Sequence, residues 1–234
     1  MAHTFLLVHG AWHGGWCWRR VSEILERQGH RVFTPTLTGL GERNHLLRAD
    51  IDLTTHITDI VNVMKWEELT DVVLCGHSYG GMVVSGVAER MQPAIASLVL
   101  LDAILPEDAD SMEMLTSEAV RATLKAAIER GDIAVPPRPA AAFLVNKKDQ
   151  AWIDAKCVPQ PIGTMTQKLR LGGARERIAK KTYVRAATYP NPGFDKALAR
   201  VRADPSWRCC EVPCGHDVMV DMPERLAEIL LDAA

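Results

Sequence analysis

The sequence predicts an α/β fold in which a doubly wound, mostly parallel sheet of six strands has helices on both faces. Short apolar runs rich in β-branched residues alternate along the chain with segments whose apolar residues recur at helical spacing. Strands that are apolar throughout are typical of parallel sheets, since helices cover both faces. A length of 234 residues with 47% hydrophobic residues suits one globular α/β unit with a large core.

The expected strands are bounded by glycine, proline or polar residues. They comprise residues 5–9, 31–37, 71–75, 97–103, 182–188 and 207–212. The expected helices comprise residues 16–28, 55–69, 81–91, 194–202 and 223–232. Gly29 ends the first of these helices, threonines stand near the start of the second, and Pro223 occupies the first turn of the last. Parallel strands require crossover connections, and ligands bind beyond the carboxyl ends of such strands.

A long interval after the fourth strand interrupts this alternation. It contains helix-like segments at residues 117–130 and 149–155, separated by a cluster of three prolines at positions 136, 137 and 139. An interval of this length is too long for a simple connection between two strands. We therefore expect a helical cap at residues 105–181, inserted between a first core part at residues 1–104 and a second at 182–234.

Charge and composition disfavour several classes of function. A net charge of −2 without a basic run argues against a nucleic-acid partner or a membrane surface. No apolar stretch reaches the roughly 18 residues that span a bilayer, and the N-terminal apolar run resembles a first strand rather than a signal peptide. The six cysteines form no C-x-x-C pair and no spacing typical of a disulfide framework, which favours a reducing, cytoplasmic location. Cys214 precedes His216 closely, but no second ligand cluster accompanies it, so we expect no metal.

The most informative segment is the run Gly76-His77-Ser78-Tyr79-Gly80, which follows an apolar strand and precedes a helix. This G-x-S-x-G pattern is typical of a sharp turn that exposes a serine hydroxyl above the edge of a sheet. The glycines are needed because strand and helix approach too closely for a Cβ. The following helix start supplies backbone N–H groups where an oxyanion would form. The pattern identifies Ser78 as the candidate nucleophile.

A serine hydroxyl needs a base, and His216 is the best candidate among the eight histidines. It follows the last strand and precedes the closing helix, which places it beyond a carboxyl end of the sheet. The first strand ends in a tight turn at His9-Gly10-Ala11. A backbone N–H of this turn, that of Ala11, can join the N–H of Tyr79 as a pair of oxyanion donors.

Three segments resemble a known family. VHGAWHGGWCW at residues 8–18, GHSYGGM at 76–82 and GHDVMVDMPERLAEIL at 215–230 resemble α/β-hydrolases, close to the salicylate-type methylesterases and the hydroxynitrile lyases. The resemblance covers nearly the whole chain except the expected cap, and it implies the oxyanion pair Ala11 and Tyr79. The lyases of this family have a threonine and a lysine where this chain has Gly10 and Asp217, so the resemblance points to ester hydrolysis.

The acid that should orient His216 is not at its usual place. In the family it follows the strand before the last one, but residues 189–193 contain no carboxylate, and Asp195 comes several residues late. Asp102 ends the strand after the nucleophile helix, a position that resembles the acid of some haloalkane dehalogenases. A charged residue at an apolar strand end also needs a partner. We expect Asp102 to orient His216, with Asp195 as the first alternative; behind it stand Asp217, Asp221 or the absence of such an acid.

The predicted function is that of a serine carboxylesterase that hydrolyses small-molecule esters through an acyl-enzyme, with no cofactor and no metal. Lactone, thioester or amide hydrolysis would use the same residues, and a ligand-sensing receptor with little turnover is an alternative of another class. Trp12 and Trp152 are expected to line the substrate pocket, and a homodimer is an expectation of the resemblance. Other apolar candidates for the pocket are Met112, Met114, Phe143 and Met165.

Overall fold

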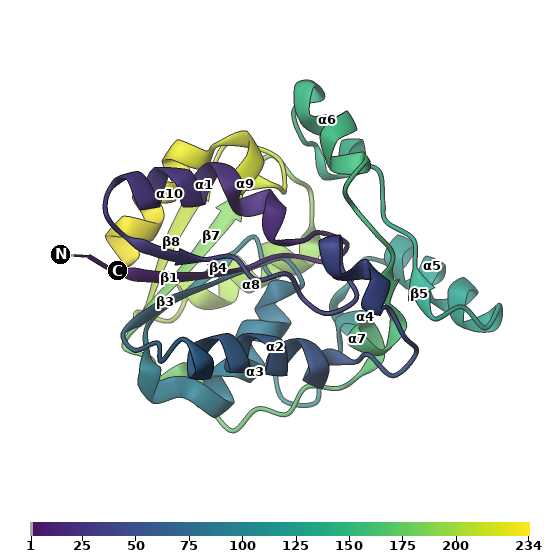
Figure 1. The fold of residues 1–234 in the computed structure, drawn as a ribbon, viewed down its shortest axis with the longest axis horizontal. Helices are drawn as coiled ribbons and strands as arrows, with labels where there is room; N and C mark the ends of the chain where they lie inside the picture. Colours follow the sequence, from purple (N-terminus) through teal and green to yellow (C-terminus); the bar gives the residue numbers. More distant parts are fainter. Residues whose placement is uncertain (1) are drawn as a thin grey trace.

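The computed structural model describes residues 2–234 and contains the predicted sheet (Figure 1). Six strands lie in the order β2-β1-β3-β4-β7-β8, and every neighbouring pair is parallel. The strands are β1 (Thr4–Val8), β2 (Arg31–Phe33), β3 (Val72–His77), β4 (Ile95–Leu101), β7 (Lys180–Ala186) and β8 (Trp207–Val212). The predicted doubly wound parallel sheet is therefore confirmed.

Helices cover both faces of this sheet. On one side lie α1 (Arg19–Arg27) and α10 (Pro223–Ala233), and on the other lie α2 (Leu53–Trp66) and α3 (Gly80–Met91) (Figure 1). The helix α8 (Pro192–Arg202) packs against β7 and β8. Between the two helical layers, β3 is buried along its whole length, as expected for a central strand. None of the helices described between residues 2 and 234 combines the length and apolar character needed to cross a membrane.

The second strand is shorter than predicted, because it leaves the sheet after Phe33. The backbone after Phe33 is hydrogen-bonded to side chains instead of to the backbone of β1. Arg43 donates to the carbonyl of Thr36, and the N–H of Leu37 donates to the ring of His9. The Thr36 hydroxyl in turn accepts from the N–H of Gly15 at 2.8 Å. These contacts hold the segment against the turn after β1.

The helix α2 begins before the predicted start, because Asp52 caps it. The Asp52 carboxylate accepts from the N–H of Thr55 at 2.8 Å, and the Thr55 hydroxyl reaches back to the N–H of Asp52. This reciprocal arrangement is a capping box. The threonines near the helix start therefore act together with an acidic cap.

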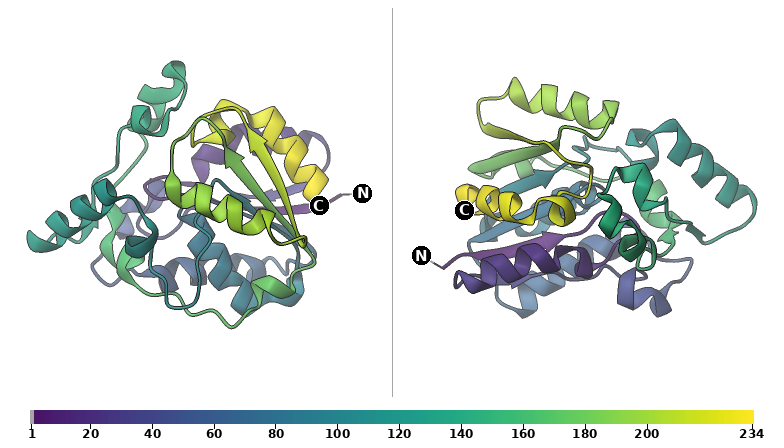
Figure 2. Two further views of the ribbon diagram at one scale, coloured as in Figure 1. Left: turned by 180° about the vertical axis from the view of Figure 1, so that it is seen from behind. Right: turned by 90° about the horizontal axis from the view of Figure 1, so that it is seen from above.

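The segment between β4 and β7 extends beyond the carboxyl ends of the strands, at the opposite end of the sheet from both termini (Figures 1 and 2). Its parts are α4 (Met112–Leu115), α5 (Glu118–Glu129), β5 (Ala134–Val135), η4 (Ala140–Phe143), α6 (Lys147–Asp154), β6 (Gln160–Pro161), α7 (Ile162–Thr166) and η5 (Arg175–Arg177). The antiparallel pair of β5 and β6 was not expected. The division of the chain into core and cap stays a prediction.

The turn after β3 generates a prediction about stability. A Cβ on Gly76 would lie 2.6 Å from the carbonyl oxygen of Gly80, whereas a Cβ on Gly172 would lie 3.2 Å from a flexible carboxylate of Glu89. We expect Gly76→Ala to lower the free energy of unfolding by about 1–3 kcal/mol, as overpacking does. Urea unfolding measures this change, with Gly172→Ala as the matched control. Equal stabilities of the two variants would contradict the close approach.

Candidate active site

Three neighbouring strands end in strained turns at the same edge of the sheet. Trp12, Ser78 and Asp102 follow β1, β3 and β4, and their φ angles are 66°, 53° and 40°. Non-glycine residues rarely adopt positive φ, and each such residue costs about 1–3 kcal/mol. Strain of this kind gathers at functional sites, where the surrounding structure holds it in place.

The turn at Ser78 is fixed by the sheet beneath it. The N–H of Ser78 donates to the carbonyl of Leu101 at 3.1 Å, and the Ser78 carbonyl accepts from Ile104 at 3.1 Å. Gly80 passes so close to β1 that a Cβ would lie 2.8 Å from the carbonyl oxygen of Val8. The serine hydroxyl therefore has a defined position above β3.

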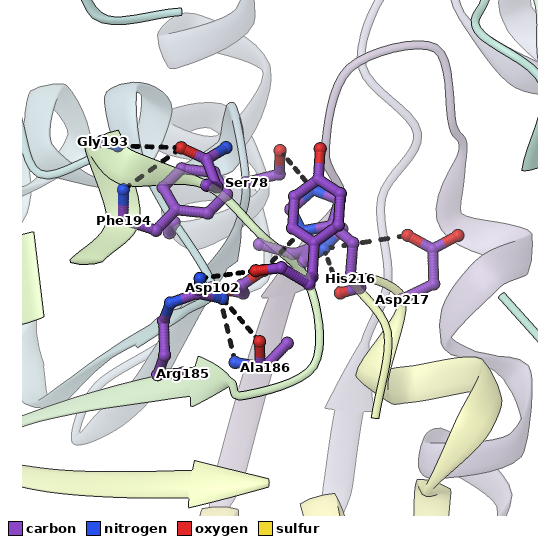
Figure 3. Close-up of polar contacts among 12 residues, drawn as sticks. Ser78, Asp102, Arg185, Ala186, Gly193, Phe194, His216 and Asp217 are labelled. Carbon is purple, nitrogen blue, oxygen red and sulfur yellow. Dashed lines mark hydrogen bonds and ion pairs between the residues drawn. The ribbon is translucent and has the colours of Figure 1, made fainter. Parts of the chain in front are cut away.

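A chain of hydrogen bonds joins Ser78 to His216 and Asp102 (Figure 3). The distance from Ser78 Oγ to His216 Nε2 is 2.9 Å, and the distance from His216 Nδ1 to Asp102 Oδ2 is 2.6 Å. Since an ionised carboxylate only accepts, Nδ1 carries the proton and Nε2 is left to accept from the serine hydroxyl. This tautomer is the one a general base requires.

The carboxylate of Asp102 is completely buried and has further donors (Figure 3). Its Oδ1 accepts from Arg185 Nη1 at 2.7 Å and from the N–H of Ala186 at 3.1 Å. Arg185 also pairs with Asp195 at 2.8 Å. Asp195 thus lies on the far side of the arginine, with its side chain 62% exposed, and it does not contact His216.

The other two candidate acids bind elsewhere. Asp221 accepts from the side chain of Asn146 at 2.6 Å. Asp217 is buried and pairs with His13 at 3.1 Å. Burial opposes charge on both members of this pair, yet the pKa of His13 lies above its ordinary value and the pKa of Asp217 below it, because each is the counter-ion of the other. Asp217 therefore forms a separate ion pair beside the histidine loop.

Aromatic rings and backbone contacts hold His216 in place. Its imidazole stacks on Phe194 and Tyr189, with ring centroids 5.5 Å and 4.7 Å away. Its backbone N–H donates to the carbonyl of Phe143 at 2.9 Å, and its carbonyl accepts from His77 at 3.1 Å. Burial, together with the nearby His216, lowers the pKa of His77 and keeps that ring neutral.

The turn after β1 and the start of α3 bring the N–H groups of Ala11 and Tyr79 to the same edge. Outside the regular helices and strands, none of the backbone hydrogen bonds within residues 2–234 uses either of these donors. The Tyr79 side chain is fixed by His56, whose Nδ1 lies 3.0 Å from the phenolic oxygen. Trp12 is fixed by the inserted segment, which is the part of the chain between β4 and β7. The N–H of Trp12 donates to the side chain of Gln160 in this segment at 3.0 Å.

A small pocket of about 40 Å³ lies beside Ser78 and His216, and its walls combine apolar and aromatic side chains with polar ones. Trp12, predicted from the sequence, lines it, and so do Met112 and Phe143. Trp152 is not among the lining residues; its ring meets Trp16 edge to face, with centroids 5.0 Å apart. The remaining walls come from Ile104, Leu115, Thr116, Ser117, Val120, Arg138, Tyr189, Asn191 and Phe194.

His77, His216 and Asp217 place potential metal-ligand atoms within 4.8 Å of one another. Both ring nitrogens of His216 already pair with Ser78 and Asp102, and Nε2 of His77 donates to a carbonyl. The group therefore offers no open set of ligands, and its arrangement suits proton transfer better than metal binding.

Sequence reasoning missed the aromatic enclosure of His216 and the role of Arg185. The arginine was visible as a charged residue between Val184 and Ala186 in the predicted strand, a position that requires a buried partner. Tyr189 and Phe194 gave no such signal, because aromatic residues near a strand end are common in any core.

Comparison with known proteins shows which family the sequence matches. The sequence matches the family described as "Alpha/beta hydrolase family" over residues 5–229. It is 43% identical to a carbendazim hydrolyzing esterase of Nocardioides sp. (strain SG-4G), across 97% of this chain and 98% of that protein. It is also 38% identical to Methylesterase 1 of Arabidopsis thaliana, over 44% of this chain and 40% of that protein.

Solved structures give the same fold. An extracellular alpha/beta-hydrolase from a Paenibacillus species superposes with a TM-score of 0.87 at 22% identity, and the match covers 99% of each chain. Tomato Methylketone Synthase I gives a TM-score of 0.82 at 21% identity, over 99% of this chain and 97% of that one. The resemblance inferred from the three sequence segments is confirmed.

His9 generates a prediction about acid stability. Its Nε2 accepts from the N–H of Leu37 at 3.1 Å and its Nδ1 donates to the carbonyl of Gly10 at 2.8 Å, an arrangement that requires the neutral ring. Burial lowers the pKa of His9 from 6.5 to about 3. The unfolded state therefore binds the extra proton first, and stability should fall by up to about 1.4 kcal/mol per pH unit as the pH drops from about 6.5 to 3.

Urea unfolding between pH 7 and pH 4 measures this dependence, and His9→Gln should reduce its slope. The exposed His45 provides the matched control, since His45→Gln should leave the slope unchanged. An identical slope in wild type and His9→Gln would contradict the assignment.

Proposed function

Because the chain belongs to the alpha/beta hydrolase family, we propose that it is a serine carboxylesterase that acts on small-molecule esters. The observation that supports this most strongly is the hydrogen-bond chain Ser78–His216–Asp102 at the floor of a pocket. The names of the Nocardioides and Arabidopsis relatives, an esterase and a methylesterase, support the same type of reaction.

In the first half of the reaction, Ser78 Oγ attacks the acyl carbon of the ester and passes its proton to His216 Nε2. Asp102 accepts from Nδ1–H and stabilises the imidazolium that forms. The carbonyl oxygen of the substrate becomes an oxyanion, which accepts from the N–H groups of Ala11 and Tyr79. His216 then gives the proton to the leaving alcohol as the C–O bond breaks, and an acyl-enzyme is left on Ser78.

In the second half, water replaces the alcohol. His216 Nε2 takes a proton from this water, whose oxygen attacks the acyl carbon of the Ser78 ester. The same two N–H groups stabilise the second oxyanion. The intermediate collapses with release of the carboxylic acid, and His216 returns the proton to Ser78. All steps use groups of this chain and one water molecule.

The pocket favours a small substrate with an apolar or aromatic part. Trp12, Phe143 and Phe194 supply flat apolar walls, which orient such a group without forming hydrogen bonds to it. Lactones or thioesters of similar size would use the same groups. The cytoplasmic location and the homodimer expected from the sequence stay predictions.

Labelling with a fluorophosphonate probe tests the serine mechanism and separates an enzyme from a ligand-sensing receptor with little turnover. We expect wild-type protein to label at Ser78 and Ser78→Ala not to label. Ser85 is buried and donates to a helix carbonyl, so Ser85→Ala is a control that should label like wild type. Equal labelling of wild type and Ser78→Ala would rule out Ser78 as the nucleophile.

A pair of asparagine variants tests the acid. We expect Asp102→Asn to lower kcat by about 10⁴, since the histidine would adopt the wrong tautomer. Asp195→Asn should keep kcat within about twofold of wild type, because the Asp195 carboxylate is exposed and its ion pair within the site is with Arg185 and not with His216. Hydrolysis of p-nitrophenyl acetate measures both, with circular dichroism to establish folding. Loss of activity in Asp195→Asn with retention in Asp102→Asn would overturn the assignment.

A further inference from the structure

We infer that Arg138 is a specificity-determining residue that binds a carboxylate carried by the substrate, remote from the ester bond. The inference rests on the proposed esterase function and adds a substrate class to it: small aromatic esters with a second, negatively charged group. Arg138 comes from the inserted segment and lines the same pocket as Ser78 and His216.

The position of the guanidinium is defined by an aromatic ring. Its central carbon lies 5.3 Å from the centroid of Phe143, and the ring of Phe143 lies 5.6 Å from the ring of His216. A guanidinium that stacks on a ring uses its face for the contact. Its N–H donors lie in the plane; the hydroxyl of Tyr189 lies within reach of one of them, and the others are left to bind a ligand.

The charge of Arg138 is not compensated by the protein. Within residues 2–234, no carboxylate forms an ion pair with it. Other arginines differ: Arg200, which lines the adjoining hollow, pairs with Glu107 at 2.9 Å, and Arg130 pairs with Asp132 at 2.6 Å. Arg138 is thus an uncompensated cation on the wall of the reaction pocket.

The neighbours of Arg138 do not supply the missing charge. Burial raises the pKa of Tyr189, so its hydroxyl is neutral. The other polar groups on the wall, from Thr116, Ser117 and Asn191, are uncharged. Arg138 is half-buried, and a half-buried cation attracts an anion more strongly than it would in water, because the dielectric screening is weaker.

The backbone around Arg138 restricts its movement. Pro137 precedes it and Pro139 follows it, and proline fixes its own φ and also restricts the residue before it. The carbonyl of the nearby Val135 accepts from the indole N–H of Trp12 at 3.1 Å, which ties this segment to the turn after β1. The arginine is therefore presented to the pocket from a stiff segment, which lowers the entropic cost of binding.

A carboxylate matches these features. The guanidinium fork binds a carboxylate through two parallel N–H···O bonds, and charge-assisted bonds of this kind are stronger than bonds between neutral groups. Such a contact would place the aromatic part of the substrate against Phe143 and Trp12. It would also orient the ester carbonyl toward Ser78.

Two pairs of substrates that differ in charge but hardly in shape test the inference. The first pair, 4-acetoxybenzoate and 4-acetoxybenzamide, carries its carboxylate or amide on the alcohol part of the ester. The second pair, monophenyl terephthalate and the phenyl ester of terephthalamic acid, carries the carboxylate or amide on the acyl part. For each pair the readout is the selectivity, kcat/KM of the anion divided by kcat/KM of the amide. We expect Arg138→Gln to lower this selectivity roughly tenfold to a hundredfold in at least one pair.

The control is Arg200→Gln, which removes a charge that Glu107 already balances and should leave the selectivity unchanged. Arg138→Lys should restore part of the selectivity, because it keeps the charge but loses the fork. A selectivity within twofold of wild type for Arg138→Gln in both pairs overturns the inference.

Binding separates failure of this inference from failure of the proposed function. Calorimetry on Ser78→Ala should give tighter binding of 4-hydroxybenzoate than of 4-hydroxybenzamide, and the added Arg138→Gln change should remove the difference. If wild type is not labelled by the fluorophosphonate and hydrolyses neither p-nitrophenyl acetate nor the four esters, but this preference is found, the esterase proposal fails and the carboxylate site stands. If the esters are hydrolysed without any dependence on Arg138, the esterase proposal stands and the carboxylate site fails.

Discussion

The buried carboxylate of Asp102 is the constraint on which the site depends. It stands at the end of β4 and accepts from Arg185 and Ala186 of β7 and from His216 beyond β8. A charge without water must be matched by donors at short range, and removal of one partner leaves the others uncompensated. The carboxylate therefore joins three adjacent strands and aligns the histidine with the serine on a fourth, β3.

The sheet supplies the rigidity that this arrangement needs. Ser78 and Asp102 adopt positive φ angles immediately beyond buried strands, and Trp12 does so in the turn that follows β1. Strained turns persist only where the surrounding packing determines them, and here close contacts between strand and helix backbones do so at Gly76 and Gly80. The free energy stored in the turns is small beside that of the core, to which β3 contributes along its whole length.

The inserted segment connects loops that are distant in sequence. Gln160 and Val158 bind the backbone of Trp12 on one side, and the carbonyl of Phe143 binds the N–H of His216 on the other. The same segment supplies Arg138 and part of the aromatic wall. It thus positions both the turn with the Ala11 N–H and the histidine loop, in addition to forming the pocket.

The sequence by itself determined the strand order along the chain, the turn with Ser78 and the loop with His216. These features are local: apolar periodicity, glycine spacing and position after a strand can be recognised without knowing what lies beside them. It also ranked Asp102 above Asp195, but only through the expected convergence of strand ends and a resemblance. The end of β2 and the start of α2 were misjudged, because side-chain bonds from Arg43, His9 and Asp52 compete with the regular pattern there.

Only the tertiary structure decided which side chains meet. Asp102 faces His216 while Asp195 faces Arg185, because β4 lies next to β7 and the arginine stands between the two carboxylates. Trp12 lines the pocket and Trp152 packs on Trp16, although the sequence predicted both tryptophans as pocket residues. Direction and distance between residues far apart in sequence follow from how helices and strands pack, and apolar pattern alone does not specify them.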